Sequence, residues 1–248
     1  MSDAVVLAGR AVRLSRRTPD ALIRAWGLPV ILMLLFVVLF GGALQTGGAY
    51  VQYVVPGVLV LAAAFGSGTT AVAVATDLDR GVVDRLRSLD VHGGAVLAGH
   101  VAATLLRSLV SSVLVVGVAL ALGSRPVAGP AAWLLAAAVL AAFVTALAWL
   151  AAVLGLLAGS AEGAGGLAFF VSFLPYLSSA FVPVATLPGW LQGVAEPQPV
   201  TTVVEALRAL LLGRPVGPLA VEALIECALV VAVCVPLAGV LFARRTSR

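Results

Sequence analysis

Residues 131–158 read AAWLLAAAVLAAFVTALAWLAAVLGLLA, a stretch without a single charged side chain. A helix of this length extends about 42 Å, more than the roughly 30 Å of a bilayer's hydrocarbon layer. An unpaired peptide group in hydrocarbon costs several kcal/mol, so a spanning segment must be a helix or a strand of a closed barrel. A barrel strand needs only about 9–11 residues. The stretch therefore predicts a membrane-spanning helix.

The rest of the chain has the same character. Of its 248 residues, 62% are apolar and 10% are charged, whereas soluble domains carry about 25% charged residues. This composition disfavours a water-soluble fold. Six segments are long and apolar enough to span, and these are 28–44, 51–76, 97–122, 131–158, 166–185 and 219–242. We predict an all-α polytopic membrane protein with six transmembrane helices.

The positions of the arginines predict the orientation, because all fifteen basic residues are arginine. With a cytoplasmic N-terminus, eleven lie in cytoplasmic segments, three lie outside, and one lies within a helix. The eleven are Arg10, Arg13, Arg16, Arg17, Arg24, Arg80, Arg85, Arg87, Arg244, Arg245 and Arg248; the three are Arg125, Arg208 and Arg214. Cytoplasmic loops carry the excess of basic residues, so we expect both termini in the cytoplasm. The arginine-only, alanine- and valine-rich composition points to a bacterial chain, and hence to the plasma (inner) membrane.

The N-terminal residues 2–17 are amphipathic when wound as a helix. The basic side of this helix carries Arg10, Arg13, Arg16 and Arg17. The pattern predicts an interfacial helix on the cytoplasmic leaflet. Anchoring to anionic lipid and coupling to a partner explain it equally well. Thr18 and Pro19 then predict a new helix, with Thr18 as N-cap and Pro19 at the first helical position.

The most polar stretch lies between the second and third spans, where residues 77–90 read DLDRGVVDRLRSLD. Residues 82–89 can form about two helical turns with Val82, Leu86 and Leu89 on one face. A simple reversal of the chain needs only a few residues. The stretch is therefore either a solvated charged turn or a contact surface, and charge alone does not decide between the two.

The outside stretch 186–218 is rich in proline and still apolar. It is too broken to span, so we expect short re-entrant helices in the outer leaflet. The residues assigned to the re-entrant helices are Pro183, just before this stretch, and Pro188, Trp190, Pro199 and Arg208 within it. Residues 201–212 predict a short helix in which Glu205 and Arg208 are spaced i, i+3.

Three charged residues fall within predicted spans, where charge is costly: Arg107, Glu222 and Glu226. Arg107 and Glu222 can snorkel to opposite interfaces. Glu226 is deeper, and we expect it to face protein or a watery cavity.

Several chemistries have no basis in the sequence. The chain has no lysine, so it lacks the P-loop lysine and ATP hydrolysis is assigned to a partner. His92 and His100 are interpreted as interfacial polar residues, because no ligand cluster of metal-binding spacing surrounds them. We therefore expect no catalytic residue, metal or cofactor on this chain, and no nucleic-acid partner.

Three motifs resemble the membrane subunits of ABC-2 type exporters, particularly the daunorubicin-resistance permease branch. They are YVVPG at 53–57, DRGVVDRLRSL at 79–89, and LSSAFVP at 177–183 followed by LPGWL at 187–191, PQPVT at 197–201 and ALRALLLG at 206–213. The resemblance covers nearly the whole chain and depends on the order and spacing of the motifs. One departure is Asp90, where these proteins often have proline.

The resemblance implies a single ABC-2 type transmembrane domain over residues 1–248. Residues 1–26 would contain the interfacial connecting helix, 77–96 the cytoplasmic coupling loop, and 186–218 the extracellular re-entrant region. The coupling helix would dock on an ATPase through Asp79, Arg80, Gly81, Asp84, Arg85, Leu86 and Arg87. Two cytoplasmic ATPase subunits would bring ATP and Mg, and a second permease copy or homologue would complete the assembly.

The expected function is export of a hydrophobic or amphiphilic drug, lipid or glycolipid, driven by the separate ATPase. Two other classes stay open. A secondary transporter would use Arg107 and Glu226 in an ion relay. A membrane assembly or anchoring subunit would move nothing.

Overall fold

The computed structural model describes residues 19–41, 50–79 and 93–246, and these residues form helices and turns without a strand. The helices are α2 (Pro19–Phe40), α3 (Tyr50–Asp79), α5 (Gly93–Ala121), α6 (Pro130–Leu157), α7 (Ala161–Val171), α8 (Gly189–Ala195), α9 (Pro199–Leu211) and α10 (Leu219–Thr246), with two 3₁₀ turns, η1 (Leu174–Leu177) and η2 (Val184–Thr186). The predicted all-α class is confirmed for this part of the chain. The predicted helix over residues 2–17 lies outside the described residues.

Four helices are long and apolar enough to cross a membrane, namely Tyr50–Asp79, Gly94–Ala121, Pro130–Leu157 and Leu219–Arg245. Two shorter apolar helical stretches are Gly27–Leu39 and Ala161–Leu177. The four long helices correspond to four of the six predicted spans, and the two shorter stretches overlap the first and fifth predicted segments, 28–44 and 166–185, without reaching the predicted length. α2 begins at Pro19, where a proline at the first helical position was expected.

The fifth predicted segment, 166–185, differs in form from a continuous helix. α7 ends at Val171, and a 3₁₀ turn with Pro175 in its first positions follows at Leu174–Leu177. Proline has no N–H for the helical ladder and clashes with the preceding turn, so Pro175 disfavours a continuation of α7. The longer helices α2, α3 and α10 do continue through an internal proline, at Pro29, Pro56 and Pro236. The backbone from Ser178 to Pro183 lies outside any helix, so its carbonyl groups can accept hydrogen bonds from other parts of the chain.

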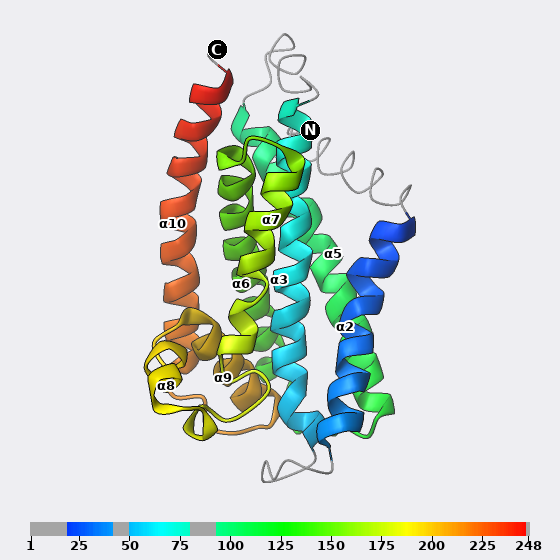
Figure 1. The fold of residues 1–248 in the computed structure, drawn as a ribbon. Coiled ribbons are helices and arrows are strands. Elements are labelled where there is room, and N and C mark those ends of the chain that lie inside the picture. The colour runs from blue at the N-terminus through cyan, green and yellow to red at the C-terminus, as the bar shows by residue number, and fades with distance from the viewer. Residues whose placement is uncertain (1–18, 42–49, 80–92, 247–248) are drawn as a thin grey trace.

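α3 is the centre of the bundle. Its apolar window is 67% buried, whereas that of α10 is 17% buried. Figure 1 shows α3 surrounded by α2, α5, α6 and α7, with α10 at the edge beside α6. Gly155 of α6 permits one close crossing, because a Cβ there would lie 2.5 Å from the Ala71 carbonyl oxygen. The exposed side chains of α10, among them Ile225 and Leu229, suit a lipid-facing surface.

The helices alternate in direction, which gives the bundle two distinct ends (Figure 1). α2, α5 and α7 run one way, and α3, α6 and α10 run back. At one end lie the start of α2, the end of α3, the start of α5 and the end of α10, and we call it the Arg244 end. At the other lie α8 and α9, which are too short to span, and we call it the α8–α9 end.

Candidate functional site

A buried arginine holds the α8–α9 end together. Arg208 of α9 is 3% exposed, and its Nη2 donates to the Ser179 carbonyl at 2.7 Å. Its Nε and Nη2 both donate to the Tyr53 carbonyl at 3.3 Å, and its Nη1 donates to Glu205 Oε1 at 2.5 Å. The guanidinium carbon lies 3.8 Å from the centre of the Tyr53 ring. One planar cation therefore joins α9, α3 and the chain after η1.

Two tyrosines and a glycine of α3 fix the same segment. The Tyr53 hydroxyl donates to the Ser179 carbonyl at 3.0 Å, and the Tyr50 hydroxyl donates to the Phe181 carbonyl at 3.2 Å. Gly57 lies directly against the Ala180 backbone, so that any Cβ at position 57 would collide with it. We call residues 178–181 the clamped segment, because hydrogen bonds and close packing hold it on both sides.

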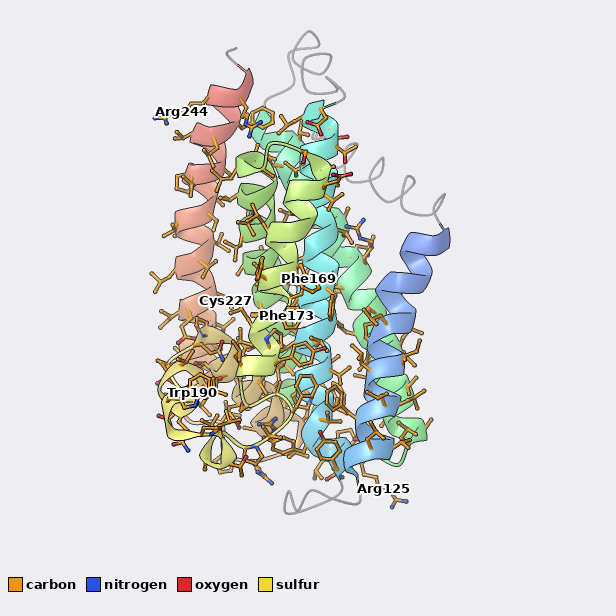
Figure 2. All side chains as sticks on the ribbon, viewed as in Figure 1. Arg125, Phe169, Phe173, Trp190, Cys227 and Arg244 are labelled. Atoms are coloured by element: carbon orange, nitrogen blue, oxygen red, sulfur yellow. The ribbon has the colours of Figure 1, made fainter. Side chains whose placement is uncertain are left out.

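A continuous row of aromatic rings leads to the clamped segment. Its centroid distances are 4.7 Å from Phe169 to Phe173, 5.7 Å from Phe173 to Tyr176, 5.2 Å from Tyr176 to Phe181, and 4.3 Å from Phe181 to Phe36. Phe169 is 56% exposed and Phe181 is 6% exposed. Figure 2 shows Phe169 and Phe173 midway along the bundle. This aromatic row therefore starts at the exposed Phe169, passes through the buried Phe181 of the clamped segment, and ends at the partly buried Phe36 of α2.

A line of polar contacts, the polar seam, joins α3 and α5 in the half of the bundle nearest the Arg244 end. His100 Nε2 lies 3.0 Å from Asp77 Oδ2, and the hydroxyls of Thr70 and Thr104 lie 2.5 Å apart. Arg107 Nη2 donates to Thr104 at 2.8 Å and to Thr69 at 3.2 Å.

The seam continues one turn deeper at Ser108. The Ser108 hydroxyl is buried beside Gly66 and has no hydrogen-bond partner among the described residues. Hydroxyls and a guanidinium thus replace apolar packing over this part of the interface.

The two acidic residues of α10 have different surroundings. Glu222 is exposed in the first turn of α10, where the positive end of the helix dipole stabilises a carboxylate. Glu226 accepts a hydrogen bond from the Thr202 hydroxyl of α9 at 3.3 Å through Oε1. Its Oε2 is buried and has no hydrogen-bond partner in the described part of the chain. The structure thus places Glu226 between α9 and α10, and Arg107 between α3 and α5.

The described residues contain only part of the predicted site. Asp79 is the exposed last residue of α3. The other predicted coupling residues (Arg80, Gly81, Asp84, Arg85, Leu86, Arg87) and the predicted connecting-helix arginines (Arg10, Arg13, Arg16, Arg17) lie outside the described residues. Asp77 and His100 lie on α3 and α5, and their contact joins the last turn of α3 to the second turn of α5.

The markers of the outside region lie at the α8–α9 end. Pro183 precedes η2, Pro188 precedes α8, and Pro199 is the first residue of α9. Trp190 is 75% exposed on α8 (Figure 2). The predicted Glu205–Arg208 pair is confirmed. The sequence did not assign a role to Tyr53, Gly57 or Ser179, although each lies in a motif quoted above.

The polar seam was also missed as a unit. Along α5, polar residues recur at His100, Thr104, Arg107, Ser108 and Ser111, about one turn apart. This spacing places most of them on one helix face, and it was the feature of the sequence from which a polar contact between helices could have been predicted.

A small cavity lies near the α8–α9 end between α3, α5, α6 and the end of α9. It measures about 20 Å³ and is lined by Gln52, Val55, Trp133 and Leu211 among others. Such a volume holds about one water molecule, so it is too small for a drug-sized compound. The exposed start of the aromatic row is the better candidate for first contact with a large apolar molecule.

Comparison with known proteins gives concordant matches. Residues 3–212 match the family described as ABC-2 type transporter. The chain is 34% identical, over 206 residues, to the daunorubicin resistance ABC transporter permease protein DrrB1 of Streptomyces coeruleorubidus, covering 82% of this chain and 73% of the relative. It is 27% identical, over 214 residues, to the probable doxorubicin resistance ABC transporter permease protein DrrC of Mycobacterium tuberculosis strain H37Rv, covering 85% of this chain and 78% of the relative.

Proposed function

This chain belongs to the ABC-2 type transporter family, and on that premise we propose that it is the permease subunit of an ATP-driven exporter of hydrophobic aromatic compounds. The observation that carries the substrate class is the aromatic row, which passes from the exposed Phe169 to the buried Phe181. Aromatic rings stack with or pack edge-on against other flat rings at centroid distances of about 4.5–7 Å. The relatives are named for resistance to daunorubicin and doxorubicin, which are flat polycyclic compounds.

The proposed arrangement in the membrane has six spans and cytoplasmic termini. Arg244 lies at one end of the bundle and Arg125 at the other (Figure 2), and the sequence puts most arginines in segments that adjoin the Arg244 end. On the positive-inside rule the Arg244 end faces the cytoplasm. α8 and α9 then form the re-entrant region on the outside, where Arg208 donates hydrogen bonds to the backbone carbonyls of Tyr53 and Ser179.

ATP hydrolysis is assigned to a separate pair of ATPase subunits, which act on two permease copies or on this chain and a homologue. Closure of the ATPase pair would push on residues 77–96 and on the connecting helix within 1–26. The Asp77–His100 contact supports this role, because it ties the end of α3 to the start of α5 on either side of the loop. A push on the loop would therefore move α3, the central helix, and through it the clamped segment.

Transport by the purified complex tests this function. We expect proteoliposomes that contain this chain and its ATPase to take up doxorubicin when ATP is supplied outside. Replacing both Phe169 and Phe173 by leucine should lower the rate roughly fivefold to a hundredfold, because two aromatic contacts are lost and each contributes about 0.5–1.5 kcal/mol beyond apolar burial. Leucine keeps the positions apolar, so membrane insertion should not change.

The matched control is Trp190→Leu, an exposed aromatic residue that lies outside the aromatic row. It should leave the rate near that of the wild type. Uptake without ATPase would instead indicate a secondary transporter, and no uptake by any combination would favour an assembly subunit. Equal losses in the Trp190 and the double phenylalanine variants would remove the row from the transport path.

Docking of the ATPase is tested separately by charge reversal at Arg85 and Arg87. We expect the doubly substituted Arg85→Glu, Arg87→Glu chain to lose at least tenfold of the ATPase that co-purifies with it, because rim charges that steer association become repulsive. Quantitative immunoblotting of the purified permease measures the ratio. Arg125→Glu, at the opposite end of the bundle, should retain the ATPase; unchanged co-purification of the double variant would exclude these residues as the docking site.

A further inference from the structure

A polar pair joins α3 to α5 in the part of the bundle nearest the Arg244 end. His100 Nε2 lies 3.0 Å from Asp77 Oδ2, and the side chains of His100 and Asp77 are 16% and 21% exposed. Because most of both side chains is covered, their hydrogen bond is stronger than the same contact on a fully hydrated surface. The pair therefore fixes the last turn of α3 to the second turn of α5.

α3 is also held at two points by backbone packing. Gly57 lies against the Ala180 backbone of the clamped segment, and the Ala71 backbone lies against Gly155 of α6. Backbone atoms meet in both contacts, so no side-chain rotation lets α3 slip past either neighbour. A displacement at the Asp77 end of α3 is therefore transmitted along the helix to α6 and to the clamped segment.

The contacts of the polar seam between α3 and α5 are made by side chains instead. The hydroxyls of Thr70 and Thr104 lie 2.5 Å apart, and Gly66 of α3 faces the side-chain hydroxyl of Ser108 on α5. Hydroxyl groups rotate to suit their surroundings, so such contacts restrain sliding less than backbone packing does. The polar pair is the seam contact nearest the end of α3, and it determines whether α3 and α5 stay together there.

We propose that Asp77 and His100 are positioning residues that make α3 and α5 move as one unit when the bound ATPase closes. This inference rests on the proposed function, in which ATPase closure drives the permease. Without the pair, the end of α3 can separate from the start of α5. Movement is then absorbed between the two helices and does not reach the clamped segment. The expected defect is uncoupling, in which ATP is hydrolysed but less drug is moved.

The experiment measures the amount of drug moved per ATP hydrolysed. The full-length chain and its ATPase are reconstituted in proteoliposomes, and doxorubicin uptake and phosphate release are recorded on the same sample. We expect Asp77→Leu and His100→Leu each to lower this ratio roughly fivefold, the scale set by the loss of one hydrogen bond, while ATP hydrolysis stays near that of the wild type. Asp77→Asn keeps an oxygen acceptor, so it should retain more of the ratio than Asp77→Leu.

The reciprocal exchange separates coupling from stability. Asp77→His combined with His100→Asp places the same two groups at exchanged positions, so the hydrogen bond can form again and most of the ratio should return. A pair that only stabilised the fold would change the amount of folded protein and leave the ratio unchanged, because both quantities come from the same sample. An exchanged chain no better coupled than the single leucine variants would overturn the proposal.

The matched control is Glu162→Leu, which removes an exposed carboxylate in the first turn of α7 at the same end of the bundle. Its ratio should equal that of the wild type. A wild-type ratio in both single leucine variants would contradict the pair as a coupling device. If these variants do not fold, the exchanged chain and Asp77→Asn provide the decision.

A second measurement requires no drug. Spin labels at the exposed positions Val72 on α3 and Gly94 on α5, in a chain whose two cysteines are replaced by alanine, report the distance between the helices with and without ATP. We expect this distance to stay constant in the otherwise wild-type complex and to increase with ATP when His100 is leucine. Equal behaviour of the two would overturn the proposal, whereas absence of doxorubicin transport by the wild type would contradict only the proposed function.

Discussion

Replacing Arg208 by alanine is expected to reduce transport at least tenfold and to lower the melting temperature of the purified chain by roughly 5–10 °C. Arg208 is 3% exposed and donates to two backbone carbonyls and one carboxylate. A hydrogen bond to a charged group contributes about 1.5–3 kcal/mol, and the hydroxyl of Tyr53, which also donates to the Ser179 carbonyl, replaces only part of what is lost. A destabilisation of about 2–3 kcal/mol corresponds to a shift of this size in a chain of this length.

Two variants separate the charge of Arg208 from its geometry. Arg208→Lys keeps the cation but loses the planar fork that serves Tyr53 and Ser179, so it should restore only part of the stability. Glu205→Gln should have a much smaller effect, because the Glu205 side chain is 39% exposed and such ion pairs contribute at most about 1 kcal/mol.

Fluorescence-detected thermal unfolding in detergent measures stability, and ATP-dependent doxorubicin uptake measures function. Arg214→Ala, an exposed arginine in the turn after α9, provides the baseline. A melting temperature for Arg208→Ala equal to that of Arg214→Ala would show that the guanidinium does not hold the α8–α9 end.

The second large effect is expected at Gly57. Gly57→Ala adds one methyl group, but its Cβ would collide with the carbonyl oxygen, carbonyl carbon and Cα of Ala180. These are backbone atoms, so no side-chain rotation can relieve the overlap. α3 or the clamped segment must move, which strains the hydrogen bonds from Tyr50 and Tyr53, at a cost of about 1–3 kcal/mol.

Gly117→Ala is the matched control, since it makes the same change on α5. A Cβ at Gly117 would meet nothing within 4 Å. Alanine favours a helix over glycine by up to about 1 kcal/mol, so Gly117→Ala should be neutral or stabilising. The two single-methyl variants are compared by thermal unfolding and by yield of monodisperse protein. Equal melting temperatures would mean that the contact between α3 and the clamped segment is looser than the structure shows.

The sequence by itself determined the helical class, the apolar segments and the local pairs. Hydrocarbon leaves the backbone few choices, so a long uncharged run such as 131–158 becomes a helix whatever surrounds it. The start of α2 at Pro19 and the pairing of Glu205 with Arg208 were also predictable, because both depend on residues close in the chain. The charged loop and the N-terminal helix stay predictions, since they lie outside the described residues.

Only the tertiary structure decided what Arg208 does. The sequence counted it among the outside arginines, yet it is buried against Tyr53, 155 positions earlier in the chain. Periodicity reports which face of a helix is apolar, but the partner of that face depends on how helices distant in the chain pack together. The same holds for Gly57 beneath Ala180 and for Arg107 beside Thr69, where the relation between two helices turns ordinary residues into a clamp and a polar seam.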